Sequence, residues 1–378
     1  PPPDRSRPIL PESEQLANYH VFDLEELSPD DVSALVTQRL AGQPSPLLLD
    51  LIQLQARGNP FFVEELSDAL RELGHLLQKE EGTWTLSVQV ITALREANCL
   101  RQNRAGQWEL NPDVPLSQAD LGLPDSIHGL VLARLDRLLE VHKLTLKVAS
   151  VIGTMFQFQV LARSHPVGFD AETLQRQVEE VERREFIRLE TPSPQLAYIF
   201  RHNITRDVAY ESLLEQQQRA LHRAVAEAIE QVLPDAVEQL AYHYGRARVR
   251  DKTLFYLDIA ARRAQREYAN GTALSYYRQA LALEDRWQWR KGQVEVLHIL
   301  GRREEERAAL EQLAALPDAA PFEVAYLWGQ YYQAIADYAQ AQASVERALE
   351  LARNRAETLA EMRCLSQLGL IARNQGNY

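Results

Sequence analysis

The chain has little sulfur: two cysteines and two methionines in 378 residues. Cys99 and Cys364 lie far apart, and neither belongs to a Cys-x-x-Cys motif or a Cys/His cluster. A disulfide framework and a zinc site are therefore both excluded as organising elements of the fold. This cysteine usage favours a reducing compartment, so we expect cytoplasmic localisation.

Long apolar runs are also missing. The most apolar stretch, residues 144–162, is interrupted by Lys147, Gln157 and Gln159, and no other stretch approaches the ~20 apolar residues that a membrane span needs. The first residues are proline-rich and polar and lack the apolar core of a signal peptide. Because no initiating Met is present, we expect a piece of a longer protein, with residues 1–19 as a linker.

Catalytic motifs are a third absence. The sequence has no GxxxxGK[ST] phosphate loop, no acidic strand end for Mg²⁺, no HExxH and no GxSxG. We therefore predict no catalytic residue, no metal site and no cofactor held by this fragment alone, which is not expected to be an enzyme by itself.

Excess positive charge is lacking as well. The net charge is −12, and it is unevenly distributed: residues 1–123 carry 9 Lys/Arg and 19 Asp/Glu, whereas residues 124–378 carry 32 and 34. A protein that follows a phosphate backbone concentrates positive charge, so binding to nucleic acid is unlikely on this ground.

The residues that are present predict a mainly α protein in three segments. The first, 20–75, is predicted to be a helical lid domain that opens with a strand-like stretch at 20–24, followed by three helices. The third helix starts at Gly58-Asn59-Pro60. Gly58 permits backbone conformations closed to other residues, and Pro60 fixes φ at the first helical position, giving a rigid start that can press against a flat ligand. The alternative is an ordinary loop-to-helix junction.

A short duplication fills residues 76–123. The sequence ALRELGHLLQKEEGTWTL at 69–86 recurs as ALREANCLRQNRAGQWEL at 93–110. Each copy is predicted to contain a helix end, a turn and a short strand with a buried tryptophan, so that the two strands pair or pack together. Trp84 and Trp108 would alternatively form a base-stacking platform, but matched strand positions favour core packing. No role is assigned to this insertion.

Residues 124–202 are predicted to be a winged helix with a small β-hairpin. Asp125 or Ser126 caps its first helix, further helices cover about 142–152, 160–164 and 170–184, and strands cover 186–190 and 196–200. The helix that would enter a DNA groove carries five Glu and three Arg over 171–185. This composition favours a structural adaptor over a DNA-binding element.

The remaining residues are helical and repetitive. Linking helices at 203–252 lead into tetratricopeptide-like repeats at 253–378, where Trp328-Gly329 recurs as Leu368-Gly369 at a spacing of 40. We expect an α-solenoid that breaks off within a repeat and binds a protein or peptide on its concave face, with self-association also allowed. Four tyrosines are assigned to the core between repeats in preference to a ligand groove: Tyr256, Tyr276, Tyr277 and Tyr332.

Two motifs resemble those of one family. Gly58-Asn59-Pro60, followed by an apolar-acidic helix, resembles the Gly-x-Pro signature in the helical lid of STAND-class signalling ATPases, relatives of AAA proteins. The segment Phe200–Leu214 resembles their Met-His-Asp motif. The resemblance implies that Pro60 packs on the adenine of ATP or ADP and that His202 bonds the β-phosphate of ADP, holding a closed state. Arg206 and Asp207 would form a local ion pair, and Asn203 stands where the family has Asp.

Over residues 20–230 the ordered motifs closely resemble the region attached to bacterial class III nucleotide cyclases and LuxR-type regulators. The resemblance implies a regulatory arm of a nucleotide-gated signalling ATPase whose phosphate loop lies before Pro1. The full-length parent would be an NTPase, with a nucleotide cyclase among its candidate outputs. In that parent, ATP or ADP would be contacted by Gly58, Pro60 and His202. Two alternatives stay open: a stand-alone tetratricopeptide scaffold and a winged-helix DNA-binding regulator.

Overall fold

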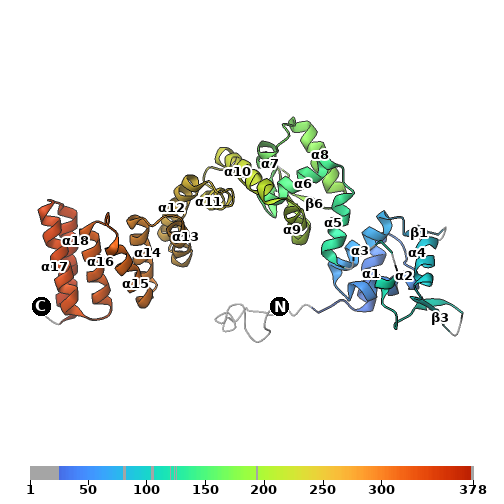
Figure 1. Cartoon of the computed structure of the whole chain (residues 1–378), viewed down its shortest axis with the longest axis horizontal. Helices are drawn as coiled ribbons and strands as arrows, with labels where there is room; N and C mark the ends of the chain where they lie inside the picture. Colours follow the sequence, from blue (N-terminus) through green and yellow to red (C-terminus); the bar gives the residue numbers. More distant parts are fainter. Residues whose placement is uncertain are drawn as a thin grey trace. The chain divides into compact units, whose positions relative to one another are not determined.

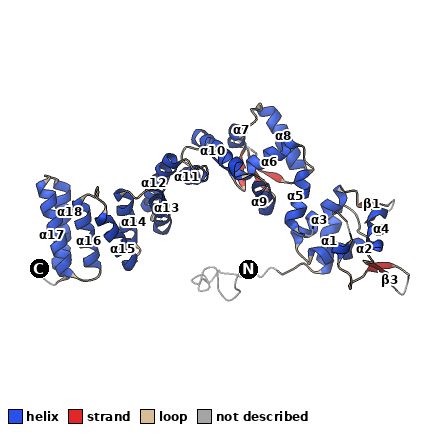
Figure 2. Ribbon diagram, in the orientation of Figure 1, coloured by secondary structure: helices blue, strands red, loops and turns tan. Residues whose placement is uncertain are grey.

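The computed structural model describes residues 25–79, 82–103, 106–119, 121–122, 124, 126–192 and 195–375. The chain divides into two compact units, Pro1–Leu139 and Glu140–Tyr378, both mainly helical (Figures 1 and 2). The expected linker at 1–19, the expected strand at 20–24 and the cap at Asp125 lie outside the described residues.

The first unit is a small helical domain with two β-hairpins. Its elements are α1 (Pro29–Leu40), α2 (Pro46–Ala56), α3 (Pro60–Glu72), β1 (Leu76–Gln78), β2 (Trp84–Leu86), α4 (Val88–Glu96), β3 (Leu100–Gln102), β4 (Trp108–Leu110), a 3₁₀ turn (Leu116–Gln118) and α5 (Ile127–Asp136). Each of the first three helices begins with proline, whose missing N–H costs nothing at that position. Ser28 caps α1: its hydroxyl accepts from the Asp31 N–H at 3.2 Å.

The duplication is visible as two hairpins in the same register. Leu76 pairs with Leu86 in one, and Leu100 pairs with Leu110 in the other, each 24 residues on. The predicted pairing of the two tryptophan strands with each other is wrong, because each strand pairs instead with a three-residue strand inside its own copy. Those first strands are too short to show an alternating pattern in the sequence.

The two tryptophans differ in their surroundings. Trp84 packs against the core and donates its indole N–H to the Leu40 carbonyl at 2.8 Å. Trp108 is 40% exposed and lies beneath the Arg95 guanidinium, 4.9 Å from the ring centre. Only the tryptophan of the first copy, Trp84, therefore packs on the core. The prediction of a buried tryptophan is wrong for Trp108.

Buried charges join three helices of this unit. Glu65 of α3 accepts two hydrogen bonds from the Arg134 guanidinium of α5, at 2.7 and 2.8 Å. Asp68, one turn further along α3, pairs with Arg39 of α1. Of these four charged residues, Glu65, Asp68 and Arg134 are at most 5% exposed. Because α5 is fastened to α3 in this way, it belongs to the first unit, whereas the sequence analysis starts the winged helix before it, at residue 124.

The second unit begins with a winged helix. Its elements are α6 (Glu140–Ile152), β5 (Met155–Gln157), α7 (Phe158–Ser164), α8 (Ala171–Arg183), β6 (Ile187–Thr191) and β7 (Ala197–Phe200). The sheet has three antiparallel strands in the order β5-β7-β6, so the predicted hairpin gains a third strand where the sequence indicates only a short apolar piece. Phe156 from that strand is buried against Tyr198 and Phe200.

An array of antiparallel helices follows. It consists of α9 (Asn203–Glu211), α10 (Glu215–Val232), α11 (Val237–Arg246), α12 (Arg250–Arg266), α13 (Asn270–Leu283), α14 (Trp287–Ile299), α15 (Arg303–Ala315), α16 (Pro321–Ala334), α17 (Tyr338–Asn354) and α18 (Thr358–Asn374). From α10 onward each helix packs on the next, as in a solenoid. The predicted start of the repeats at 253 falls inside α12.

Small residues bring paired helices close together. A methyl group added at Gly329 of α16 would collide with Val345 of α17, and one at Gly292 of α14 would collide with the Tyr277 ring of α13. Tyr256 and Tyr277 are buried, which supports a core role for these two tyrosines.

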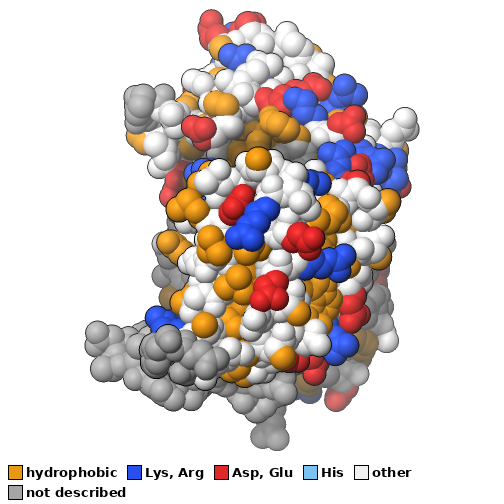
Figure 3. All heavy atoms as spheres, turned by 90° about the vertical axis from the view of Figure 1, so that its left-hand side faces the viewer, with side chains coloured by type: hydrophobic (Ala, Val, Ile, Leu, Met, Phe, Trp, Pro, Cys, Tyr) orange, Lys and Arg blue, Asp and Glu red, His pale blue; other side chains and the backbone are white. Residues whose placement is uncertain are grey.

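The last helix carries apolar side chains on both faces. Its inner face contributes Ala360, Cys364 and Ile371 to the core shared with α16 and α17. Figure 3 faces this end of the array and shows orange side chains lying between charged ones. Four side chains of α18 are exposed: Leu359, Met362, Leu365 and Leu370.

Candidate functional site

The turn between α2 and α3 requires glycine at position 58. Gly58 has φ of +74°, and its carbonyl accepts from the Leu27 N–H at 2.8 Å. A Cβ at this position would lie 2.8 Å from the Glu26 Cβ and 2.9 Å from the Leu27 carbonyl oxygen. Both the conformation and the close approach of the segment before α1 therefore exclude a side chain here.

The two residues after Gly58 start α3. The Asn59 side chain accepts from the Phe62 N–H at 3.1 Å, which makes Asn59 the N-cap, and Pro60 occupies the first helical turn. Pro60 is exposed, whereas Phe62 and Val63 behind it are buried. The turn is thus rigid and presents the proline ring to the surface.

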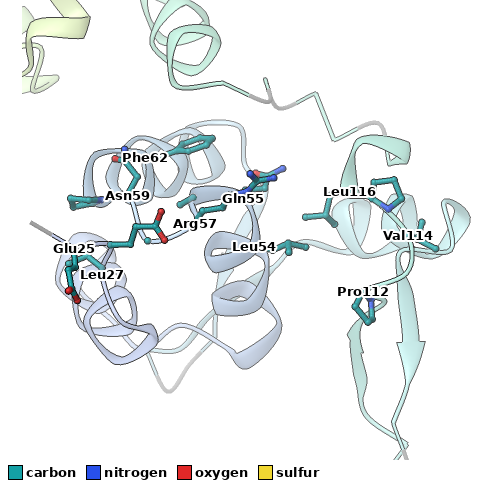
Figure 4. A pocket seen from close by; sticks show the side chains of 15 residues that line it. Glu25, Leu27, Leu54, Gln55, Arg57, Asn59, Phe62, Pro112, Val114 and Leu116 are labelled. Atoms are coloured by element: carbon teal, nitrogen blue, oxygen red, sulfur yellow. The ribbon is translucent and has the colours of Figure 1, made fainter. Parts of the chain in front are cut away.

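A hollow of about 1040 Å³ adjoins this turn. Figure 4 shows its side chains coming from two places, the region of the turn and the segment after β4 that carries Pro112, Val114 and Leu116. The volume is in the range of a small-molecule site. The sequence indicates Gly58 and Pro60 but not the second wall of the hollow. Nothing in the residues of that wall predicts that the chain after β4 folds back on α2.

The lining is suited to an apolar or flat group. Leu54 is half exposed at the hollow, and Pro60, Phe62 and Leu116 add apolar surface. Its charged members are Glu25, Glu26 and Arg57. Two carboxylates against one guanidinium repel a polyphosphate, so this hollow fits the flat part of a nucleotide better than its phosphates.

His202 lies in the second unit, so it does not share the hollow with Gly58 and Pro60. It is the N-cap residue of α9, and its carbonyl accepts from the Thr205 N–H at 3.1 Å. The side chain is partly exposed. The ion pair expected next to it is present, with Arg206 Nε 3.0 Å from Asp207 Oδ1.

The helix α8 does not offer free cations to DNA. Arg176 pairs with Glu172 at 3.5 Å, and Arg183 pairs with Glu180 at 2.8 Å, all on the same helix. Their charges are locally neutralised by carboxylates that would repel phosphates. This arrangement supports the adaptor interpretation over the DNA-binding one.

A hydrogen-bond relay that no sequence pattern predicts runs through α9, α10 and α11, with two buried histidines at its centre. Arg246 donates to the Tyr210 hydroxyl at 2.7 Å, and that oxygen lies 3.0 Å from His222 Nε2. The Nδ1 atoms of His222 and His243 are 2.9 Å apart, and His243 also bonds the backbone of Ile152, at the end of α6. These residues are spread over three helices, so no motif reveals them.

The relay has one consistent set of hydrogens. Tyr210 accepts from Arg246 and can therefore give its own proton to His222 Nε2, which leaves the His222 proton on Nδ1. That N–H points at His243 Nδ1, so the His243 proton sits on Nε2 and reaches the Ile152 carbonyl. Both imidazoles are neutral in this arrangement.

The two histidines are poor bases. Burial, helped by His243 and Arg246, lowers the pKa of His222 from 6.5 to about 3. Burial lowers the pKa of His243 to about 4, against the hydrogen bond to Ile152. Their low pKa values agree with the neutral pair that the relay requires.

Within the described ranges, no group of three His, Cys, Asp or Glu side chains is placed to hold a metal ion. Over the same residues, none of the helices combines the length and apolar character needed to cross a bilayer.

Comparison with known proteins gives a distant likeness to a solved structure. No protein-family model matches the sequence, and no curated protein matches it. Among solved structures, the chain is similar to a Signal Transduction ATPase with Numerous Domains (STAND) protein with a tetratricopeptide repeat sensor from Pyrococcus horikoshii. The sequence identity is 13% and the TM-score 0.34, over 94% of this chain and 52% of that chain. The chain thus spans about half the length of that structure.

Proposed function

We propose that this chain is the regulatory arm of a nucleotide-gated signalling ATPase of the STAND class, acting in the cytoplasm. The observation that carries the proposal is the turn at Gly58 to Pro60, which holds an exposed proline ring at the rim of a hollow of about 1040 Å³ whose wall combines apolar side chains with Glu25, Glu26 and Arg57. A flat base packs well on such a ring, and the local carboxylates leave the phosphates to another part of the protein.

In this proposal the two units bind different parts of ADP. Pro60 of the first unit contacts the adenine, and His202 at the start of α9 donates to the β-phosphate. An ATPase core outside residues 1–378 supplies the phosphate loop, the Mg²⁺ site and catalysis, and a nucleotide cyclase is one candidate output domain. A protein or peptide partner on the helical array shifts the population towards an open, self-associating state.

The test uses the protein together with its ATPase core and measures release of a fluorescent ADP analogue. Pro60→Ala and His202→Ala should each speed release by about tenfold, since each removes one contact of the closed state. Pro46→Ala is the matched control, because Pro46 also begins a helix of the first unit but does not line the hollow. Release rates equal to the unmodified protein in both test variants would reject the proposal.

A stand-alone interaction scaffold is the second candidate. Phe255 of α12 is 57% exposed beside a hollow of about 520 Å³ whose lining includes Asp251 and Trp289. An apolar side chain of a peptide fits that place. If the scaffold function is the whole function, Phe255→Ala should abolish partner capture. Tyr268→Ala should not, because Tyr268 is a more exposed aromatic outside this hollow. The rate of ADP release should then be unchanged in the Pro60 and His202 variants.

A further inference from the structure

A second, smaller cavity lies among α9, α10 and α11. Its volume is about 170 Å³, and seven side chains with polar or charged groups dominate its wall: Tyr210, Glu215, Gln218, Arg219, His222, Arg246 and Arg248. It is separate from the hollow at Pro60, and nothing in the proposed function uses it.

The wall carries excess positive charge. Three guanidinium groups face one carboxylate, that of Glu215, which pairs with both Arg219 and Arg248. Arg246 donates only to the neutral Tyr210 hydroxyl, and among the described residues it has no carboxylate within ion-pair distance. A guanidinium without a carboxylate partner attracts an anion.

One donor in this wall has no acceptor. The Nε atom of Arg219 is sealed from solvent and makes no hydrogen bond within the described part of the chain. Its Nη2 pairs with Glu215, and its Nε is left without an acceptor. Arg219 therefore contributes its positive charge to the wall with one N–H still unsatisfied.

The size of the cavity limits what can enter. A volume of about 170 Å³ corresponds to about five or six waters at their liquid volume of roughly 30 Å³ each. A tetrahedral oxyanion with a few waters fits this space, and guanidinium groups bind such oxygens in pairs. We propose that the cavity binds a phosphate group, either inorganic phosphate or the terminal phosphate of a small molecule such as a nucleotide.

Binding would be reported by the relay behind the cavity. The groups that face His222 are Arg246, Tyr210 and Tyr242, together with His243 across the pair. An anion next to Arg246 offsets the positive charge that disfavours the protonated imidazole. The ring signals of His222 should therefore move on titration, and the pKa of His222 should rise.

The experiment titrates inorganic phosphate into the full chain at constant ionic strength, followed by calorimetry and by NMR of the histidine rings. Saturable binding is expected, and Arg246→Gln should weaken it by about tenfold or more, the usual effect of losing a charged hydrogen bond. Arg223→Gln is the control, because this exposed arginine of α10 pairs with Glu227 and does not line the cavity.

Two outcomes would overturn the proposal: no saturable phosphate binding by the unmodified chain, or equal affinity in the Arg246 and Arg223 variants. Arg219→Gln removes a guanidinium charge that a different helix contributes to the wall and should also weaken binding, which keeps the test valid if the Arg246 variant disturbs α11. Displacement of phosphate by ADP would identify a nucleotide as the source, and failure to displace it would identify free phosphate; both results support the cavity. Since His202 is absent from this wall, the result is independent of the ADP-release test.

Discussion

The neutral histidine pair predicts acid sensitivity in the helices that it joins. In the folded protein the pKa values of His222 and His243 are about 3 and about 4, below the 6.5 of an unfolded chain. Between these values the unfolded chain binds more protons than the folded one. Stability from the pair is therefore fully present above pH 6.5 and is lost as the pH falls, down to about 4 for His243 and about 3 for His222.

The size of the effect follows from the shifts. Each pH unit below 6.5 costs each ring about 1.4 kcal/mol. Both rings remain neutral in the folded protein at about pH 5, so the pair should lose about 4 kcal/mol between about pH 7.5 and pH 5, or about 3 kcal/mol after solvent screening. That loss is a large fraction of the stability of a domain.

Hydrogen exchange measured by mass spectrometry can localise this loss. After correction for intrinsic exchange rates, the free energy of opening α10 and α11 should be about 3 kcal/mol lower at about pH 5 than at about pH 7.5. His243→Asn keeps an acceptor for the His222 ring and removes one titrating group, so its loss should be about half as large. An imidazole titration midpoint near 6.5 for either ring, or the same tautomer on both, would refute the reasoning.

Three further predictions concern packing. Glu65→Gln should destabilise the first unit by about 1–3 kcal/mol in urea unfolding, because Arg134 loses its nearest carboxylate and keeps only the longer contacts to Asp68 and Glu72, and a second change of Arg134→Met should restore most of it. Gly58→Ala should cost about 1–3 kcal/mol more than Gly74→Ala: both glycines have positive φ, but only Gly58 lacks space for a Cβ, so equal losses would contradict the clash. Gly329→Ala should cost about 1–3 kcal/mol and loosen α16 from α17, which hydrogen exchange of those helices can measure.

Local signals gave reliable predictions. The helix start at Gly58-Asn59-Pro60 depends on residues that lie next to each other in the chain, and the structure begins α3 at Pro60, as predicted. The need for glycine at position 329 also depends on a short-range contact, because an added methyl group would collide with the next helix along the chain. The 24-residue duplication predicts the repetition of a unit, although not the pairing of its strands.

Contacts between distant residues could not be predicted. Glu65 and Arg134 are 69 positions apart, and each looks like an ordinary surface charge in its own helix until the helices pack. The second wall of the hollow, around Val114 and Leu116, depends in the same way on the folding back of the chain after β4. His222 interrupts an apolar helix face, a pattern that does not reveal its partner 21 positions away.

The relay also has a direction. Its two ends are groups with only one capability each, since the Arg246 guanidinium can only donate and the Ile152 carbonyl can only accept. Every hydrogen between these two ends must therefore point the same way. The tautomer of His222 is thus set by Arg246 and the Ile152 carbonyl, to neither of which His222 is hydrogen-bonded. A proton added to either ring would set two donors against each other, so the bonds joining α6, α9, α10 and α11 hold or fail as a set.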